Sequence, residues 1–537
     1  MSKACRKTSR KQSGHRIGRR EVLGGGGLLA TSTLFYGSPL LAAPAGPQRR
    51  KGPDLYRSLG VRPLINCKGT YTIITGSLTL PEVKRAMEEA SRYYVHLDEL
   101  MDAVGRRLAE LTRTEWGIVT AGCSAAETLA TCACVAGANP ENIQRLPNLD
   151  GLKDEVIIPR YSRNVYDHAV RMVGVKLVTV DNMQELEAAF GAQTAMVYIL
   201  ACPDDTGPFG LEPIAKVARR KGVPVFVDAA AEDLTPEVHL GRGADLVAYS
   251  GGKAIRGPQC AGLLLGRKDL CQAAWVNSAP HHAFGRSLKV GKEEIMGMLA
   301  AVEIWYKRDH KAEWKSWESW LGEIARQLKK VSAVSTEVLQ PGSLSNRSPR
   351  LEIKWDGTSL GISGEEVYEQ LLNGDPRIIL GSATGNYRDG MEESSVQIMP
   401  WMMQPGEETI VASRLYEVLS DPPKIDRPAQ PRGQPADVAG RWDAQLEFTL
   451  GKDDHIFFFE QEGERLVGTH LGRTLVGGLK GRVEGNEIDF QSSQPYEGTR
   501  LHFRFTGRVQ GDSIHGAVDL DEYGQARWMA RRYQYRS

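Results

Sequence analysis

The fold of this chain is decided by Val223-Pro-Val-Phe-Val-Asp-Ala-Ala230 and by Gly243-Ala-Asp-Leu-Val-Ala-Tyr-Ser-Gly-Gly-Lys-Ala-Ile-Arg-Gly-Pro-Gln-Cys-Ala-Gly262. Each stretch contains a short apolar run that ends at a polar residue. Such runs are typical of strands in a mostly parallel sheet covered by helices. Asp228 ends the first run, and Lys253 follows the second run, 25 positions after Asp228. Because ligands of open α/β sheets bind at the carboxyl ends of the strands, we expect both side chains to face one crevice.

The same alternation of apolar runs and helical patterns extends from about residue 56 to residue 419. We predict strands at Trp116–Thr120, Glu155–Pro159, Lys176–Val180, Ala195–Leu200, Pro224–Asp228, Asp245–Ser250 and Ala261–Leu265. Between them we predict helices at Ser124–Val135, Arg163–Met172, Met183–Phe190 and Leu211–Arg220. This order predicts an α/β architecture with a large, doubly wound and mostly parallel sheet.

An acid and a lysine in this order suit pyridoxal 5′-phosphate (PLP) as a cofactor. A carboxylate keeps the ring nitrogen of PLP protonated, and a lysine amine forms a Schiff base with its aldehyde. We therefore predict that Asp228 pairs with the ring nitrogen, and that Lys253 carries the cofactor and moves the proton at the substrate Cα. Taken singly, Asp228 would be a turn acid and Lys253 a solvated lysine. The Ser250-Gly-Gly-Lys253 turn and the rigid Gly257-Pro258 pair favour the joint function.

The phosphate of the cofactor needs a turn with free backbone N–H groups at the start of a helix. The sequence Thr120-Ala-Gly-Cys-Ser-Ala125 joins a predicted strand to a predicted helix. We assign the phosphate site to Gly122, Cys123 and Ser124, with the hydroxyl of Ser250 as a further donor. Taken alone, this turn is as often an ordinary strand-to-helix junction. No metal site is predicted, because the eight cysteines form no Cys-x-x-Cys pair and several lie among small residues.

The N-terminus has the pattern of an export signal. Residues 1–20 contain eight Lys or Arg and no acid, and they end in Arg19-Arg20. A charge-free segment runs from Val22 to Gln48 and includes the small-residue sequence Ala43-Pro-Ala45. We interpret residues 1–45 as a twin-arginine signal peptide, which predicts export of the folded protein to the periplasm or beyond by the twin-arginine export machinery. The alternatives are an uncleaved membrane anchor and a disordered basic tail.

The charge balance bears on the partners of the mature protein. Removal of residues 1–45 would leave 59 Lys and Arg against 65 Asp and Glu, a formal charge of −6. An acidic protein binds polyanions poorly. The composition therefore argues against a nucleic-acid partner.

The composition changes twice toward the C-terminus. From Lys292 the pattern turns helical, so we predict a large PLP-binding domain over residues 56–291 and a smaller α+β part of the same catalytic unit over 292–420. Five of the fifteen residues 421–435 are proline, which predicts an extended linker over 421–438. Alternating runs then predict an antiparallel β-barrel or sandwich over 439–537. These runs are Trp442–Leu450, His455–Gln461, Arg465–Thr469, Glu487–Gln491, Leu501–Val509 and Ser513–Asp519.

Five stretches of the chain carry a resemblance to a known enzyme family. They are Leu59–Thr70, Val119–Ala126, Val227–Glu232, Ala244–Gly262 and Pro400–Glu407. They resemble PLP enzymes related to bacterial selenocysteine synthase (L-seryl-tRNA(Sec) selenium transferase), within which they are similar to the branch that includes D-glucosaminate-6-phosphate ammonia-lyase. The resemblance implies PLP-dependent fold type I, the aspartate aminotransferase-like fold, with Lys253 as the Schiff-base lysine and Asp228 as the partner of the pyridine nitrogen. It also implies a homo-oligomer with sites at subunit interfaces, where the segment around Asn66 would reach a neighbouring site.

The resemblance also suggests residues that would contact the substrate. Arg163 and Arg377 would anchor an anionic group, and Tyr161 would either stack on the cofactor ring or belong to the core. Gly251 and Asn164 stand where the ammonia-lyase branch is expected to have a histidine. The particular substrate of that branch therefore does not transfer to this chain.

We predict a PLP-dependent lyase or transferase that removes the Cα proton of a small amino acid or amino sugar. A selenium transferase acting on seryl-tRNA is one alternative. The charge of −6, the lack of a basic module before the catalytic region and the export signal argue against it. The other alternative is an exported, non-catalytic binding module with a degenerate PLP site.

Overall fold

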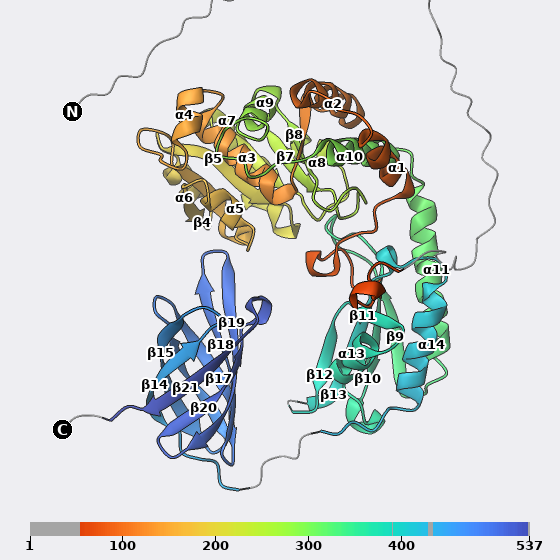
Figure 1. Cartoon of the computed structure of the whole chain (residues 1–537), viewed down its shortest axis with the longest axis vertical. Helices are drawn as coiled ribbons and strands as arrows, with labels where there is room; N and C mark the ends of the chain where they lie inside the picture. The colour runs from red at the N-terminus through yellow and green to blue at the C-terminus, as the bar shows by residue number, and fades with distance from the viewer. Residues whose placement is uncertain (1–53, 389, 428–432, 535–537) are drawn as a thin grey trace, which may run out of the picture. The chain divides into compact units, whose positions relative to one another are not determined.

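A computed structural model of the chain describes residues 54–388, 390–427 and 433–534. Its largest sheet has seven strands, surrounded by helices (Figure 1). In spatial order the strands are β2 (Trp116–Thr120), β8 (Gly262–Gly266), β7 (Leu246–Ser250), β6 (Val225–Asp228), β5 (Thr194–Leu200), β3 (Glu155–Pro159) and β4 (Lys176–Val180). β8 runs antiparallel to β2 and β7, and all other neighbouring pairs are parallel. This mostly parallel sheet confirms the predicted α/β fold.

Burial of whole strands explains why they are visible as apolar runs. Every residue of β2, β6 and β8 is buried. The helix α3 (Cys123–Ala136) lies against β5, β7 and β8, and its small, buried side chains allow a close approach. The other helices of this part are α1 (Pro81–Ala90), α2 (Leu97–Thr112), α4 (Pro140–Arg145), α5 (Asp167–Arg171), α6 (Met183–Ala189), α7 (Leu211–Lys221), α8 (Pro236–Gly241), α9 (Lys268–Val276) and α10 (Lys292–Trp305).

One helix is shorter than its sequence pattern predicts. A helix was expected over Arg163–Met172, whereas α5 spans only Asp167–Arg171. The Oδ1 atom of Asn164 accepts a hydrogen bond from the backbone N–H of Tyr166 at 2.7 Å. Such a local bond competes with the helical hydrogen bonds of the backbone. The segment before α5 is therefore a turn, and from it Asn164 reaches Tyr198 in β5.

A second hydrophobic core lies in the part of the chain that follows α10. Its antiparallel sheet has the order β12 (Ala383–Asn386), β13 (Gly390–Ile398), β10 (Arg350–Trp355) and β9 (Val334–Leu339). Its helices are α11 (His310–Leu328), α12 (Gly357–Leu360), α13 (Gly364–Asn373) and α14 (Glu407–Ser420). The early strand β1 (Leu64–Cys67) joins this core by pairing in parallel with β11 (Arg377–Leu380). Because α10 packs in the first core, the two parts exchange elements across the boundary that composition suggests at residue 292.

The C-terminal part is a closed barrel of eight antiparallel strands, which confirms the predicted barrel or sandwich as a barrel (Figure 1). Each strand pairs with the next, and β21 also pairs with β14. The strands are β14 (Gly440–Glu447), β15 (Lys452–Glu462), β16 (Arg465–Leu471), β17 (Val476–Glu484), β18 (Glu487–Tyr496), β19 (Thr499–Gln510), β20 (Ser513–Asp519) and β21 (Gln525–Arg532). Its core is rich in aromatic side chains, which are Trp442, Phe457, Phe459, Phe490, Phe503, Phe505 and Trp528.

The strand β17 escapes recognition in the sequence because it is rich in glycine. A Cβ atom at Gly477 would lie 2.2 Å from the carbonyl oxygen of Ser493, and one at Gly481 would lie 2.2 Å from that of Asp489. Both glycines therefore allow β17 to lie close against β18.

Two predictions fall on parts of the chain outside the described residues. They are the export signal at residues 1–45 and residues 428–432 of the expected linker. Among the helices that the structure describes, none combines the length and the apolar character needed to cross a membrane.

Candidate functional site

Asp228 and Lys253 lie at the carboxyl ends of two neighbouring parallel strands, β6 and β7. Asp228 is the last residue of β6, is 1% exposed, and lies opposite Ala248 of β7. After β7 ends at Ser250, the chain makes a tight turn that contains the half-buried Lys253. Backbone bonds close this turn, since the N–H of Gly251 donates to the carbonyl of Ala261 at 2.8 Å. The sheet and the turn thus bring the acid and the lysine to the same edge.

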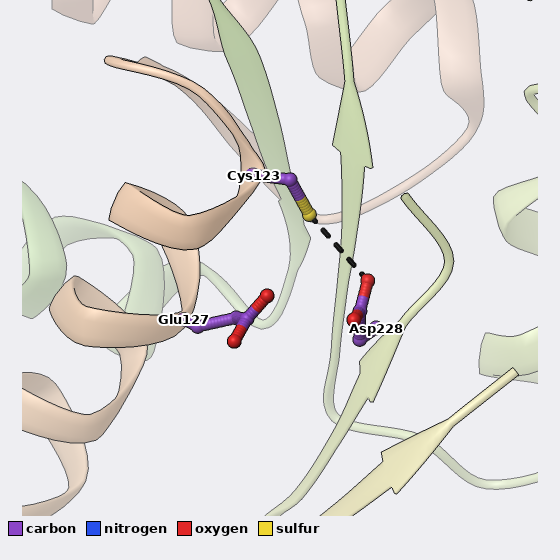
Figure 2. Close-up of side chains that lie close together, drawn as sticks. All are labelled: Cys123, Glu127 and Asp228. Carbon is purple, nitrogen blue, oxygen red and sulfur yellow. Dashed lines mark hydrogen bonds between the residues drawn. The ribbon is translucent and has the colours of Figure 1, made fainter. Parts of the chain in front are cut away.

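The carboxylate of Asp228 accepts three hydrogen bonds. The hydroxyl of Tyr198 in β5 donates to Oδ2 at 3.0 Å, and the backbone N–H of Ala230 donates to Oδ1 at 2.9 Å. The thiol of Cys123, at the start of α3, donates to Oδ1 with a sulfur–oxygen distance of 3.6 Å (Figure 2). A carboxylate has about four lone-pair positions. One acceptor position of this buried charge is therefore left for a further donor.

The groups around Asp228 are held in their neutral forms. Burial, and then the charge of Asp228, raises the pKa of the Tyr198 phenol. Burial, and then the charge of Asp228, also raises the pKa of Glu127, which is 1% exposed on α3. The pKa of the Cys123 thiol is raised by burial and by both carboxylates, while the positive charge of Lys253 opposes the rise. Negative charge in this region is thus concentrated on Asp228.

Cys123, Glu127 and Asp228 come close together (Figure 2). Their sulfur and carboxylate oxygen atoms lie within 4.8 Å of one another, and these are also ligand types for metal ions. The thiol of Cys123 already donates a hydrogen bond to Asp228, whose carboxylate also accepts from Tyr198 and from the backbone N–H of Ala230. We therefore interpret the cluster as the buried, hydrogen-bonded end of an organic ligand site.

The start of α3 offers free backbone donors. Gly122 has a φ of +95°, and the first hydrogen bond of the helix runs from the N–H of Ala126 to the carbonyl of Gly122. The N–H groups of the first turn therefore have no partner within the helix, which suits an anion such as phosphate. A Cβ atom at Gly262 would lie 2.5 Å from the carbonyl carbon of Gly122, so β8 passes directly against this turn. Ser124 is exposed there, and Ser250 is half-buried at the end of β7.

The four residues predicted to contact the substrate, Asn66, Tyr161, Arg163 and Arg377, have different surroundings. Arg163 donates from Nε to Asp167 at 2.6 Å and from Nη1 to Thr179 at 2.8 Å. The hydroxyl of Tyr161 donates to the carbonyl of Phe209, so Tyr161 is engaged in packing. The other two side chains bond to the backbone near them: Nδ2 of Asn66 donates to the carbonyl of Gly69, and Nε of Arg377 donates to that of Leu372. Asn66 and Arg377 lie on the paired strands β1 and β11, in the second core.

The structure explains the residues at the two positions where a histidine would be expected, Gly251 and Asn164. A Cβ atom at Gly251 would lie 2.7 Å from Sδ of Met298 and 2.7 Å from the carbonyl oxygen of Ala261, which leaves no room for a side chain. Asn164 donates from Nδ2 to the hydroxyl of Tyr198 at 3.3 Å. Asn164 therefore acts on the site through Tyr198, whose own hydroxyl bonds to Asp228.

Two residues of the site were not predicted from the sequence. Tyr198 lies inside an apolar strand run, and only the placement of β5 beside β6 brings it to Asp228. Glu127 could have been recognised from the sequence, because it is the one acid within a predicted helix of small, mostly apolar residues. Such a residue is buried only when its environment neutralises or pairs it.

A family model and several known proteins are similar to this chain. The Aminotransferase class-V family matches residues 167–284. D-glucosaminate-6-phosphate ammonia lyase of Salmonella typhimurium is 27% identical over 379 residues, which cover 68% of this chain and 98% of that protein. 5′-C-glycyluridine monooxygenase-decarboxylase of a Streptomyces species is 29% identical over 380 residues, with coverages of 68% and 92%. L-seryl-tRNA(Sec) selenium transferase of Moorella thermoacetica is 24% identical over 340 residues, with coverages of 57% and 66%.

A solved structure of D-glucosaminate-6-phosphate ammonia-lyase has the same fold. The TM-score is 0.60 at 25% sequence identity, and the match covers 69% of this chain and 100% of that structure. The fold defines the class as PLP-dependent fold type I. Within that class, the chain is similar to Aminotransferase class-V and selenocysteine synthase-like enzymes.

Proposed function

We propose that this chain binds PLP and removes the Cα proton of a small amino acid or amino sugar, with a lyase or transferase outcome. The observation that carries the proposal is the environment of Asp228. A buried carboxylate with three neutral donors and one open acceptor position suits a single positively charged N–H group. A protonated pyridine ring is such a group.

The residues present fit each part of the cofactor. Lys253 would hold it covalently, Asp228 would accept from the ring nitrogen, and the first turn of α3 with Ser250 would bind the phosphate. When bound, the cofactor supplies an electron-poor ring that takes up negative charge as a bond at Cα breaks. The raised pKa values of Cys123 and Glu127 keep competing negative charges away from Asp228. Burial of this end of the site also keeps water away from the ring nitrogen.

Lys253 is the group that we propose to move the proton. The half-buried amine is held on a turn whose backbone is fixed by hydrogen bonds at Gly251 and Gly257. A free lysine amine accepts a proton from Cα and returns it elsewhere on the substrate, which is general base and acid chemistry. No other residue of the cluster combines basicity with this position, because Cys123 and Glu127 already carry their protons.

The relatives' names support a small substrate over tRNA. D-glucosaminate-6-phosphate and 5′-C-glycyluridine are both small molecules with an amino group. The formal charge of −6 that remains without residues 1–45 further disfavours tRNA. A tRNA-dependent shift in electrophoretic mobility at moderate salt would instead support a selenium transferase.

We also propose twin-arginine export of the folded, cofactor-loaded protein. The support is the Arg19-Arg20 pair with the charge-free segment that follows it. Fusion of residues 1–50 to a reporter should give export that stops when Arg19 and Arg20 are both replaced by lysine. A reporter that stays in the cytosol in the parent fusion would contradict this proposal.

The test of the cofactor site uses the full chain with Lys253→Ala and the exposed control Lys216→Ala. We expect a visible absorption band from bound PLP in the parent and in the control, and borohydride should fix the cofactor to a peptide that contains Lys253. Lys253→Ala should bind PLP without covalent attachment. Attachment at another lysine, or no band in the parent, would contradict the proposal and leave the non-catalytic binding module as the better function.

A further inference from the structure

The C-terminal barrel contains a cavity that the catalytic unit does not explain. Its volume is about 470 Å³, and it opens among the β14–β15, β16–β17 and β20–β21 connections. Ligand sites commonly have volumes of about 300–1,000 Å³. Apolar side chains that line it include Phe448, Leu475, Leu501 and Phe503. Eight-stranded barrels have an interior that is either filled by side chains or holds one small ligand.

In this barrel the two cases divide the interior. One part is filled by aromatic rings in edge contact, among them Phe457, Phe490 and Trp528, with centroid separations of 5.2–5.7 Å. The other part is the cavity. His455 stands where the two meet, because it lines the cavity while its ring lies 4.9 Å from that of the fully buried His470.

Three polar side chains form a hydrogen-bonded row inside this apolar interior. Nδ1 of His455 lies 2.7 Å from Nε2 of His470, and Nδ1 of His470 lies 2.7 Å from the hydroxyl of Ser492. The row ends at Nε2 of His455, whose nearest acidic atom, Oδ2 of Asp453, is 4.0 Å away and too distant for a hydrogen bond. His455 is 6% exposed. Nε2 of His455 has no hydrogen-bond partner in the protein among the described residues, and it is accessible at the cavity wall, so a molecule in the cavity can bond to it.

The charge of the cavity sets the kind of ligand. Asp453 is its acidic lining residue and Arg473 its permanently charged basic one, and the exposed His502 also lines it. One fixed charge of each sign thus lies at the wall, so neither sign of ligand charge is favoured. Burial lowers the pKa of His455, and burial with the neighbouring His455 lowers that of His470 to about 3, so both rings are neutral at pH 7. Because the hydroxyl of Ser492 rotates, the row has two arrangements, in which Nε2 of His455 either accepts or donates. A hydroxyl group complements both arrangements.

We propose that the barrel cavity binds a small, uncharged, mainly apolar molecule whose hydroxyl group hydrogen bonds to Nε2 of His455. The apolar body would contact Phe448, Leu501 and Phe503. This site is separate in its residues from the PLP site, so it gives the chain a second ligand.

The test compares three probes of nearly equal shape: 2-naphthol, 2-methylnaphthalene and 2-naphthoate. Their binding to the full chain is measured by displacement of the neutral fluorescent probe N-phenyl-1-naphthylamine. We expect 2-naphthol to bind roughly three- to tenfold more tightly than 2-methylnaphthalene, the factor that one hydrogen bond provides. Tighter binding of 2-naphthoate would overturn the proposal in favour of an anion site at Arg473. Equal binding of the first two probes, or no binding, would also overturn it.

Variants locate the binding in the barrel. Leu501→Trp should fill the cavity and abolish binding of all probes. His455→Phe should remove the preference for 2-naphthol and keep 2-methylnaphthalene bound, whereas His515→Phe, at an exposed position outside the cavity, should change nothing. Circular dichroism and thermal melting establish that each variant is folded. A folded Leu501→Trp or His455→Phe variant that binds all probes as the parent does would refute the site.

Discussion

Asp228 is held ready as an acceptor by donors of three kinds: a phenol, a backbone amide and a thiol. The phenol of Tyr198 and the thiol of Cys123 are kept neutral, because burial raises the pKa of each. Neutral donors stabilise the carboxylate without cancelling its charge. Asp228 can therefore compensate a positive charge that arrives with a ligand.

Tyr198→Phe tests this arrangement with the loss of one oxygen atom. A hydrogen bond to a charged group contributes about 1.5–3 kcal/mol, so we expect PLP affinity to fall about tenfold or more. The measurement is a titration of the unloaded full chain with PLP, followed by absorbance. Tyr161→Phe is the matched control, because its hydroxyl donates to the carbonyl of Phe209 rather than to Asp228. Equal losses in the two variants would show that Asp228 does not depend on the phenol.

Glu127→Gln tests whether Glu127 is neutral in the fold. Burial raises its pKa above the ordinary 4.5, so the folded protein keeps a proton that the unfolded chain loses as pH rises. Stability therefore falls with rising pH in this range, because the folded state binds more protons. The uncharged glutamine should melt at a higher temperature than the parent at pH 8, with a smaller difference at pH 5. The exposed Glu141→Gln should show no such dependence. A less stable Glu127→Gln at pH 8 would indicate an ionised, ligand-bound carboxylate.

At the scale of elements, the row of His455, His470 and Ser492 makes the barrel sensitive to acid. The pKa of His470 is lowered from 6.5 to about 3 by burial and by His455. His470 therefore binds a proton below about pH 6.5 in the unfolded chain, but only below about pH 3 in the folded barrel. The contribution of neutral His470 to the free energy of unfolding is fully present above pH 6.5. As pH falls below 6.5 it is lost by about 1.4 kcal/mol per pH unit for one such group. Asp453 and Asp454 moderate the effect by favouring protonation of His455.

His470→Gln should flatten this dependence, since glutamine does not titrate and still offers hydrogen-bonding atoms to Ser492. Calorimetric melting of the full chain at pH 7 and pH 4.5 gives the comparison. Between pH 7 and pH 4.5, the melting temperature of the barrel should fall further in the parent than in His470→Gln. An equally steep loss in both proteins would show that His470 does not limit the stability of the barrel in acid.

The elements that the sequence predicted well are those whose local pattern and final burial agree. β2, β3 and β4 have the predicted bounds. In β2 and β3 the apolar run between turns is buried almost throughout, whereas β4, at the edge of the sheet, is only partly buried. β17 was missed because its glycines serve contacts with β18 that no local pattern reveals. At the site, Asp228 and Lys253 were predicted from their chemistry and order. Tyr198 and the pairing of β1 with β11 depend on contacts between distant segments, so they required the structure.

At the scale of the whole molecule, an apolar run remains exposed between α1 and α2. Tyr93, Tyr94 and Val95 are consecutive and are 62%, 103% and 50% exposed. In the segment that precedes α1, Tyr71 and Ile73 are 55% and 89% exposed. Exposed apolar side chains that adjoin one another mark interaction surfaces, and aromatic residues are enriched in such interfaces. Because fold type I enzymes are typically homodimers, we propose that a second copy of this chain covers the run.

Tyr94→Glu tests this proposal. A charge at the centre of an apolar interface is left unpaired on association, so we expect the dimer to weaken by at least tenfold and the variant to sediment as a monomer at micromolar concentration. Sedimentation velocity of the full chain gives the oligomeric state, and Tyr523→Glu, at a 67% exposed position in the barrel, is the control. A monomeric parent would refute the dimer, and a dimeric Tyr94→Glu would move the interface elsewhere. If the monomer also loses PLP affinity while Tyr523→Glu keeps it, the second copy contributes to the cofactor site, as the resemblance around Asn66 implies.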